Sequence, residues 1–330
     1  MKRAVLWLVT LAGLVAGVVA TAAIVAWLRY NEPGPLAAAT TVVIERGAGA
    51  GQIAGQLVEA GVLDEPWTFR LGVLLAGGGR VLRAGEYRIP PAISPRAAVD
   101  LLASGRTVIH RLTIPEGLTS AQVVALVRQI EILEGDIAVA ADEGTLLPET
   151  YFYSRGDYRN AIMERQRKAM DDALSQLWAE RAPGLPLNSP REALILASIV
   201  EKETSLAAER PRVAAVFINR LKKGMRLQAD PTVVYGLTDG KGPLDRPLAR
   251  ADLETRHRWN TYVIDGLPPT PIANPGRAAL EATLKPADSD ELYFVADGSG
   301  GHVFAKTLAE HNRNVARLRA AERLRGNNQQ

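Results

Sequence analysis

The stretch Ser189-Pro-Arg-Glu-Ala-Leu-Ile-Leu-Ala-Ser-Ile-Val-Glu-Lys-Glu-Thr204 decides how the rest of the chain is interpreted. Ser189 can cap a helix, Pro190 suits its first turn, and Glu192 can complete a capping box. The next two turns are almost wholly apolar, which is typical of a helix surrounded by other elements. We therefore predict a helix that is buried on most sides.

The end of this helix carries two carboxylates, Glu201 and Glu203, although a helix C-terminus does not favour an anion. At about 100° per residue, Glu203 shares a stripe with apolar residues, whereas Glu201 points the opposite way. The apolar stripe consists of Leu196, Ile199, Val200 and Leu206. Apolar surroundings raise the pKa of a carboxyl group, which suits a general acid working near neutral pH. We predict that Glu203 is such an acid, with an ordinary solvated helix end as the alternative.

The composition is that of a globular protein with room for about two domains. The 330 residues include no cysteine, which excludes disulfides, thiolate metal sites and cysteine nucleophiles. The four histidines lack the spacing typical of metal ligands, so we expect neither a metal nor another cofactor. A net charge of +3, with no basic run interleaved with aromatics, gives no indication of a nucleic-acid partner.

An apolar run from Ala4 to Leu28 follows two basic residues at the N-terminus. About 20 apolar residues suffice for a helix to cross a bilayer. A cleaved signal peptide is the alternative, because Ala20-Thr-Ala22 resembles a cleavage site, but signal peptides have apolar stretches of only about 7–15 residues. We predict a transmembrane anchor over residues 1–30 with its N-terminus in the cytoplasm. The rest of the chain would lie outside the cytoplasmic membrane.

Residues 31–110 have the pattern of a small α/β module. The expected strands and helices cover residues 41–44, 52–60, 67–74, 85–89 and 94–102. Glycines between residues 47 and 51 indicate a turn, since no Lys-Ser/Thr of a phosphate-binding loop follows, and those at 77–79 indicate a loop. The strand–helix outline recurs over 111–130 as a weak repeat. Such modules resemble LysM domains, which bind glycans containing N-acetylglucosamine; a generic α/β spacer is the alternative.

Residues 111–330 indicate a mixed α+β domain, which makes α+β the predicted class of the whole chain. Helices are expected over 160–181 and 211–223 and from Thr307 onward, and a β-hairpin over 292–304. A polar loop over 225–236 opens onto a short helix. Residues 143–151 and 266–271 are expected to be loops, the second because it is too rich in proline for a helix or a central strand.

Five motifs between residues 197 and 302 together resemble the endolytic murein transglycosylase family, also called MltG or YceG-like. They are Ala197-Ser-Ile-Val-Glu-Lys-Glu-Thr204, Val216-Phe-Ile-Asn-Arg-Leu221, Met225-Arg-Leu-Gln-Ala-Asp-Pro-Thr-Val-Val-Tyr-Gly236, Asn260-Thr-Tyr262 with Gly266-Leu-Pro-Pro269, and Tyr293-Phe-Val-Ala-Asp-Gly-Ser-Gly-Gly-His302. They occur in the family's order, and the resemblance covers essentially the whole chain.

The resemblance implies a carbon–oxygen lyase, a lytic transglycosylase that cuts nascent peptidoglycan strands between N-acetylmuramic acid and N-acetylglucosamine. Its products would carry 1,6-anhydro-muramyl ends. The family's catalytic acid is the second Glu of Glu-Lys-Glu-Thr, which is Glu203 here. It would protonate the leaving oxygen and then, as a carboxylate, take the proton of the sugar's own 6-hydroxyl. Peptidoglycan strands are the implied partner, with peptidoglycan synthases working beside the anchored enzyme.

Several polar residues are candidates for the rest of the site. We expect Gln228, Asp230, Asn260 and Tyr262 to hold N-acetyl and hydroxyl groups of the sugar; hydrogen bonds within their own loops are the alternative. Glu201 is a candidate for supporting the acid, with a solvent-facing position as the alternative. A muramidase, with Glu201 or Asp230 as second carboxylate, would instead leave reducing ends. A non-catalytic glycan-binding scaffold would tolerate Glu203→Gln.

Overall fold

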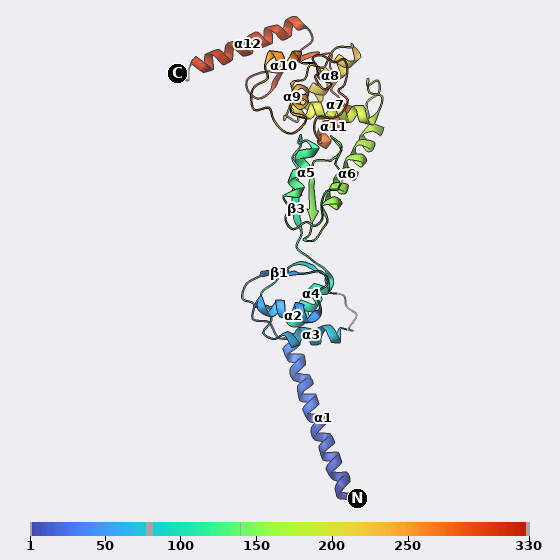
Figure 1. The fold of residues 1–330 in the computed structure, drawn as a ribbon, viewed down its shortest axis with the longest axis vertical. Coiled ribbons are helices and arrows are strands. Elements are labelled where there is room, and N and C mark those ends of the chain that lie inside the picture. The colour runs from blue at the N-terminus through green and yellow to red at the C-terminus, as the bar shows by residue number, and fades with distance from the viewer. Residues whose placement is uncertain (1, 77–81, 139, 328–330) are drawn as a thin grey trace. The chain divides into compact units, whose positions relative to one another are not determined.

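The computed structural model describes residues 2–76, 82–138 and 140–327, and the chain divides into two units. Unit one is Met1–His110 with Phe152–Asp157, and unit two is Arg111–Tyr151 with Tyr158–Gln330. Figure 1 shows the elements of each unit. Both contain helices and small antiparallel sheets, in agreement with the predicted α+β class.

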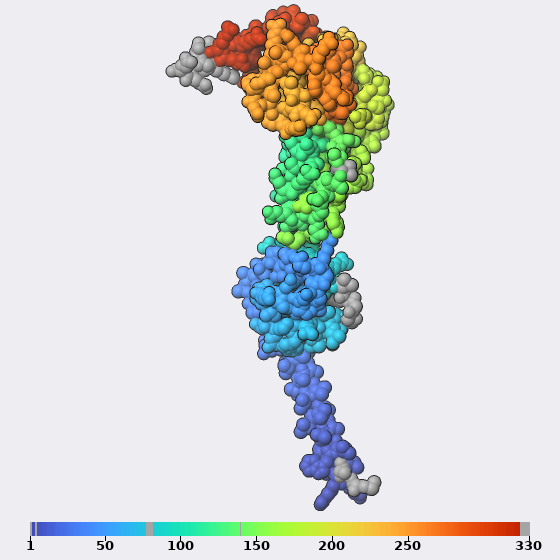
Figure 2. Space-filling model, in the orientation of Figure 1, coloured from blue at the N-terminus to red at the C-terminus, as the bar shows by residue number. Residues whose placement is uncertain are grey.

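The N-terminal helix α1 spans Lys2–Asn31. Its segment Val5–Asn31 is long and apolar enough to cross a membrane, and none of this segment is buried inside the protein. Figure 2 shows the side chains of α1, in dark blue, uncovered by the rest of unit one. A soluble core helix would bury one face, so full exposure of an apolar helix fits the predicted membrane anchor.

The rest of unit one is built on an antiparallel pair of strands, β1 (Thr40–Ile44) and β2 (Gly85–Ile89). Three helices complete it, namely α2 (Ala50–Glu59), α3 (Pro66–Leu75) and α4 (Pro95–Ser104). Alternate residues of β2 are buried, and Tyr87 is enclosed with Leu57, Phe69 and Leu102 in one apolar core. The turn predicted around Gly47 is confirmed by its φ of 81°. The glycines at 77–79 lie outside the described residues.

A second sheet pairs β3 (His110–Thr113) with β4 (Thr150–Tyr153), and α5 (Ser120–Arg128) follows β3. The predicted strand and helix of this segment are therefore present. The prediction that residues 143–151 form only a loop is wrong at its end, where β4 begins. The four residues of this strand have no alternating pattern that would predict a strand. It forms through pairing with β3, which is remote in the sequence.

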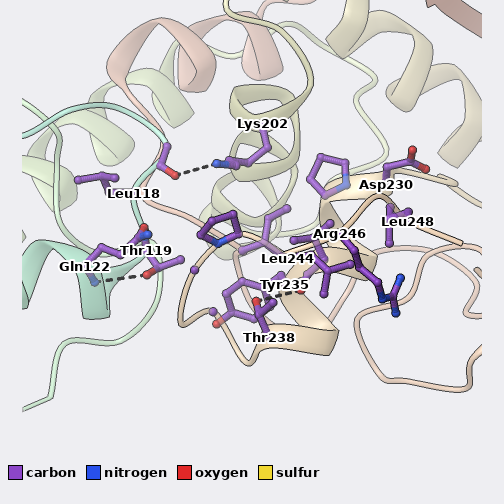
Figure 3. A pocket seen from close by; sticks show the side chains of 17 residues that line it. Leu118, Thr119, Gln122, Lys202, Asp230, Tyr235, Thr238, Leu244, Arg246 and Leu248 are labelled. Carbon is purple, nitrogen blue, oxygen red and sulfur yellow. Dashed lines mark hydrogen bonds between the residues drawn. The ribbon is translucent and has the colours of Figure 1, made fainter. Parts of the chain in front are cut away.

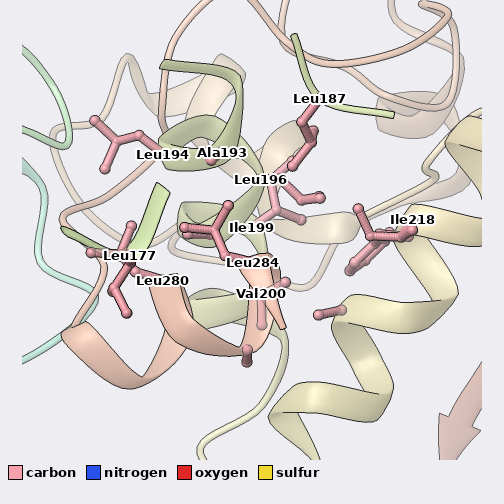
Figure 4. Close-up of a cluster of buried hydrophobic side chains, with 14 of the residues drawn as sticks. Leu177, Leu187, Ala193, Leu194, Leu196, Ile199, Val200, Ile218, Leu280 and Leu284 are labelled. Atoms are coloured by element: carbon pink, nitrogen blue, oxygen red, sulfur yellow. The ribbon is translucent and has the colours of Figure 1, made fainter. Parts of the chain in front are cut away.

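Unit two packs around α7, which spans Pro190–Glu203 and has nine buried residues. It is surrounded by α6 (Arg159–Ala179), α8 (Arg210–Lys222) and α11 (Arg277–Leu284). Figure 4 shows side chains of α7 and of these neighbours filling one apolar cluster. Helix α11 was not predicted, nor was the short α10 (Arg250–Glu254). Neither is long enough to show a clear helical period in the sequence.

The two ends of α7 refine the prediction. The Ser189 hydroxyl accepts a hydrogen bond from the Glu192 N–H at 3.2 Å, as a cap should. The Glu192 carboxylate, however, accepts from the N–H of Asn188 at 2.7 Å, one residue before the position of a standard capping box. The helix stops at Glu203, so Leu206 lies beyond it and is exposed, outside the predicted apolar stripe.

The remaining elements are α9 (Asp230–Thr238), β5 (Tyr293–Ala296), β6 (His302–Ala305) and α12 (Leu308–Asn327). Strands β5 and β6 form the predicted antiparallel hairpin, with Tyr293 opposite Ala305. Helix α12 packs on this hairpin, where the ring of His311 stacks on Tyr293 at 5.3 Å. The proline-rich segment 266–271 is irregular, as predicted.

Candidate active site

Glu203 is the last residue of α7 and is half-buried. Among the residues that the structure describes, its carboxyl group has no hydrogen-bond partner. Burial is the main cause that raises its pKa to about 8, the negative charge of Asp230 raises it further, and the positive charge of Arg220 opposes both. A carboxyl group in this setting is mostly protonated at neutral pH, so it can act as an acid.

Two loops beside Glu203 are joined through Thr261. Its hydroxyl accepts a hydrogen bond from the N–H of Ala229 at 2.9 Å and lies 2.9 Å from the hydroxyl of Thr232. Its carbonyl accepts from the N–H of Gln228 at 3.2 Å. Thr261 and Thr232 are fully buried, so these bonds are shielded from water and fix the two loops against each other.

This junction brings Asp230 and Tyr262 together. The Tyr262 hydroxyl donates to the Asp230 carboxylate at 2.6 Å. Burial, Asp230 and then Glu203 raise the pKa of Tyr262, so the phenol stays protonated and remains a donor. Asp230 itself is exposed, in the first turn of α9, where the helix dipole favours a carboxylate. The two predicted residues thus lie together in the electrostatic field of Glu203.

Arg220 was not predicted as a site residue, although it belongs to the motif Val216–Leu221. Its buried guanidinium donates to the carbonyls of Leu227 and Leu292, both at 2.7 Å. Burial lowers its pKa, and the nearby Tyr293, Tyr262 and Glu203 counteract this effect. A basic residue among the apolar positions of α8 is the signal that could have identified it.

Gln228 lies on the surface next to Arg220. Its side-chain Oε1 accepts from the Arg220 guanidinium at 3.3 Å. Its backbone is left-handed, with a φ of 52°, a conformation that a residue with a side chain adopts at a cost. The exposed amide remains available to a ligand, while the hydrogen bond to Arg220 holds it at the site.

Asn260 and Glu201 are not placed as the sequence suggested. The Asn260 amide is fully buried and donates to the carbonyls of residues 252, 253 and 255, so it shapes its own loop and faces no ligand. Glu201 is not solvent-facing, because its carboxylate accepts from the Arg210 guanidinium at 3.1 Å and from the N–H of Gly276 at 2.9 Å. Arg210 also binds Glu116 at 2.9 Å. Glu201 therefore joins α7 to α8 and to the start of α11.

A cleft of about 440 Å³ opens beside these residues in unit two. Asp230 and Lys202 form part of its wall, together with Thr119, Gln122, Tyr235 and Arg246. Figure 3 shows these side chains around the cleft, with Lys202 donating to the carbonyl of Gly117. Glu203 does not line the cleft, but it lies between Lys202 and Thr204 in the chain.

Comparison with known proteins identifies the family. The sequence profile of the YceG-like family matches residues 42–317. An endolytic murein transglycosylase from Bacillus subtilis (strain 168) is 31% identical over 320 residues, which cover 86% of each chain. One from Streptococcus pneumoniae serotype 2 (strain D39 / NCTC 7466) is 28% identical, covering 84% of this chain and 58% of that protein.

A solved structure agrees with these matches. The crystal structure of a YceG-like protein from Listeria monocytogenes is 32% identical and superposes with a TM-score of 0.51. The match covers 83% of this chain and 98% of that one. The profile match spans most of the chain and includes every residue of the candidate site, so the chain belongs to the YceG-like family.

Proposed function

We propose that this protein is an endolytic murein transglycosylase, a lyase that cuts nascent glycan strands between N-acetylmuramic acid and N-acetylglucosamine and leaves 1,6-anhydro-muramyl ends. The observation that carries the proposal is the raised pKa of Glu203, about 8, in a site assembled from the family's motifs. The names of the relatives from Bacillus subtilis and Streptococcus pneumoniae support a murein transglycosylase role.

In the proposed reaction Glu203 acts twice. The protonated carboxyl gives its proton to the glycosidic oxygen as the bond from that oxygen to the anomeric carbon of N-acetylmuramic acid breaks. The 6-hydroxyl of the same sugar then bonds to the anomeric carbon and loses its proton to the Glu203 carboxylate. The acid is restored, no water is consumed, and a second catalytic carboxylate is unnecessary. Attack from within the same sugar also supplies a high effective concentration.

The neighbours of Glu203 suit this cycle. Asp230 adds to the effect of burial in keeping the acid protonated before the reaction, and it presents a negative charge to the positive charge that develops at the anomeric carbon. The positive charge of Arg220 opposes the negative charge of Asp230 and so limits the rise in the pKa of Glu203. The carboxylate that the second step requires can therefore still form. We propose that Gln228 and Tyr262 contact sugar hydroxyl or N-acetyl groups. Tyr262 would do so through the face of its ring and through its hydroxyl.

In this proposal the rest of the chain holds the active site close to its substrate. Residues 1–30 anchor the protein in the cytoplasmic membrane with the N-terminus inside. Residues 31–110 form a LysM-like glycan-binding subdomain, and residues 111–330 form the periplasmic catalytic domain. A single-pass anchor would hold the enzyme where glycan strands are synthesised, beside peptidoglycan synthases.

Mass spectrometry of digested peptidoglycan tests the reaction. The full chain in detergent is compared with Glu203→Gln and with Glu281→Gln, a matched change at an exposed residue of α11. We expect anhydro-ended fragments from the native protein and from Glu281→Gln, and none from Glu203→Gln. Reducing-ended fragments would support the muramidase, for which Asp230 is the second carboxylate. Glycan retention without cleavage by any of the three would support the scaffold.

A further inference from the structure

Helix α3 has an apolar outer face that the core of unit one does not cover. Trp67, Leu74 and Leu75 are 40%, 70% and 68% exposed. Leu71, which is half-buried, completes a stripe with the spacing of one helical face. The opposite face, with Phe69 and Gly72, is buried in unit one. An exposed apolar stripe of this kind is usually an interaction surface.

This face is continuous with the apolar surface of α1. On the buried side of α3, the ring of Tyr30, near the end of α1, packs on Gly72 so closely that a Cβ at this position would collide with it, so the two helices are in contact. Trp67 shares a groove with residues of α1 between Leu14 and Ala26. The outer face of α3 thus begins where the surface of the proposed membrane-spanning helix ends.

The tryptophans of α1 indicate where the bilayer boundary would lie. Trp7 and Trp27 are 76% and 64% exposed and are twenty residues apart. At 1.5 Å per residue this spacing is about 30 Å, the thickness of the hydrocarbon core of a bilayer. Tryptophan favours the two boundaries of that core. The outer boundary therefore falls near Trp27, close to the level at which Tyr30 contacts α3, and Trp67 faces residues of α1 on the membrane side of this boundary.

We propose that the outer face of α3 inserts into the interface of the outer leaflet beside α1, so that unit one is docked on the lipid surface as well as tethered to it. The proposal rests on the membrane anchor of the proposed function. Trp67, Leu71, Leu74 and Leu75 enter the boundary between headgroups and acyl chains. Arg70 is exposed on the same side of α3, and its long side chain can extend to lipid phosphates.

A bilayer is the occupant that the surroundings favour. The stripe adjoins a helix that is apolar from Val5 to Leu28 apart from two threonines and is not buried there, and a tryptophan lies where the two surfaces meet. A second copy of the chain is the other occupant that an apolar face could have. It would have to cover α3 without displacing the lipid that surrounds α1.

Site-directed spin labelling of the full chain tests the docking, because the sequence contains no cysteine that would interfere. Single variants Leu74→Cys and Leu75→Cys are labelled and reconstituted in vesicles of phosphatidylethanolamine and phosphatidylglycerol. Val15→Cys, in the middle of α1, is the control for the anchor, and Thr41→Cys, on an exposed position of β1, is the control for water. Circular dichroism checks that each variant is folded.

We expect the labels at 74 and 75 to collide more with oxygen than with a water-soluble nickel chelate, as the label at 15 does, and the label at 41 to show the reverse. Labels at 74 and 75 that behave like the one at 41, with the label at 15 still in lipid, would overturn the docking but keep the anchor. Labels at 74 and 75 that are inaccessible to both reagents would show that a protein partner, and not lipid, covers the outer face of α3, which would overturn the proposal. A water-accessible label at 15 would refute the anchor itself.

Discussion

The hydroxyl of Tyr262 lies 2.6 Å from the carboxylate of Asp230, and this contact joins the first turn of α9 to the loop that follows α10. It holds a negative charge near Glu203, which is one of the reasons why the pKa of that acid is raised. The charge of Asp230 thus favours the protonated form of Glu203.

Asp230→Asn should lower the pKa of Glu203 below its native value of about 8, because a negative neighbour is removed. In the proposed reaction Glu203 starts protonated, so activity should fall as pH rises through this pKa, and the variant should lose activity at a lower pH than the native protein. The measurement is kcat/KM for release of anhydro-ended fragments between pH 5 and 10. Asp239→Asn, which removes the charge of an exposed residue at the other end of α9, is the control. An unchanged profile in Asp230→Asn would separate Asp230 from the acid.

Glu203→Gln should make the protein more stable at pH 7 while abolishing cleavage. Folded Glu203 stays protonated up to about pH 8, whereas the unfolded chain releases this proton at about pH 4.3. The folded state therefore binds more protons between these values, and the free energy of unfolding falls as pH rises through this window. Glutamine does not ionise, so the variant should gain about 1–3 kcal/mol at pH 7 and nothing at pH 4. Urea unfolding at both pH values measures the gain, and a loss at pH 7 would assign Glu203 a structural role.

Glu201→Gln should have the opposite effect, although the two residues are neighbours on α7. The change removes the charge that faces the buried Arg210 guanidinium. Removing one partner of a buried ion pair costs about 3–5 kcal/mol, reduced here because Glu116 still binds Arg210. Burial raises the pKa of Glu201 and offsets part of this cost, so we expect a loss of about 1–2 kcal/mol in urea unfolding, with near-native activity per folded molecule at low temperature. Loss of activity in a variant that is still fully folded would give Glu201 a part in the chemistry.

Arg220 can be tested with two variants that separate charge from geometry. Both Arg220→Lys and Arg220→Met lose the hydrogen bonds to the carbonyls of Leu227 and Leu292, which should cost about 2–4 kcal/mol. Only Arg220→Met removes the positive charge that lowers the pKa of Glu203. The pH at which activity is lost should therefore rise in Arg220→Met and stay close to native in Arg220→Lys. A common shift in both variants would show that position, and not charge, is responsible.

Thr261→Val should disturb the site from a distance. It leaves the buried N–H of Ala229 without an acceptor, at a cost of about 1–3 kcal/mol, and frees the loop that carries Asp230. We expect cleavage to fall about 10–100-fold, since displacements of about 1 Å have effects of this size. Thr283→Val is the matched control, because the buried Thr283 hydroxyl has no hydrogen-bond partner among the described residues. The control should be neutral or slightly more stable, and equal activity losses in the two variants would contradict the role of Thr261.

Much of the fold could be predicted from local patterns. The cap at Ser189 and the apolar run of α7 predicted that helix, and alternation with a glycine-rich turn predicted the hairpin of β5 and β6. The apolar run at the N-terminus predicted α1. In each case the signal lies within one element, where side-chain period and turn residues act over a few positions.

The sequence by itself also determined that Glu203 lies at the end of a buried helix, and its apolar neighbours in that helix led to the prediction that it is an acid. Only the tertiary structure decided the fates of the other polar residues. Glu201 is buried because Gly276, 75 residues away, supplies its N–H, and Asn260 is buried because its own loop curls around its amide. Arg220 reaches the site because the carbonyls of Leu227 and Leu292 meet there. Helical period fixes the direction of a side chain, but its burial and partners depend on segments that only folding brings together.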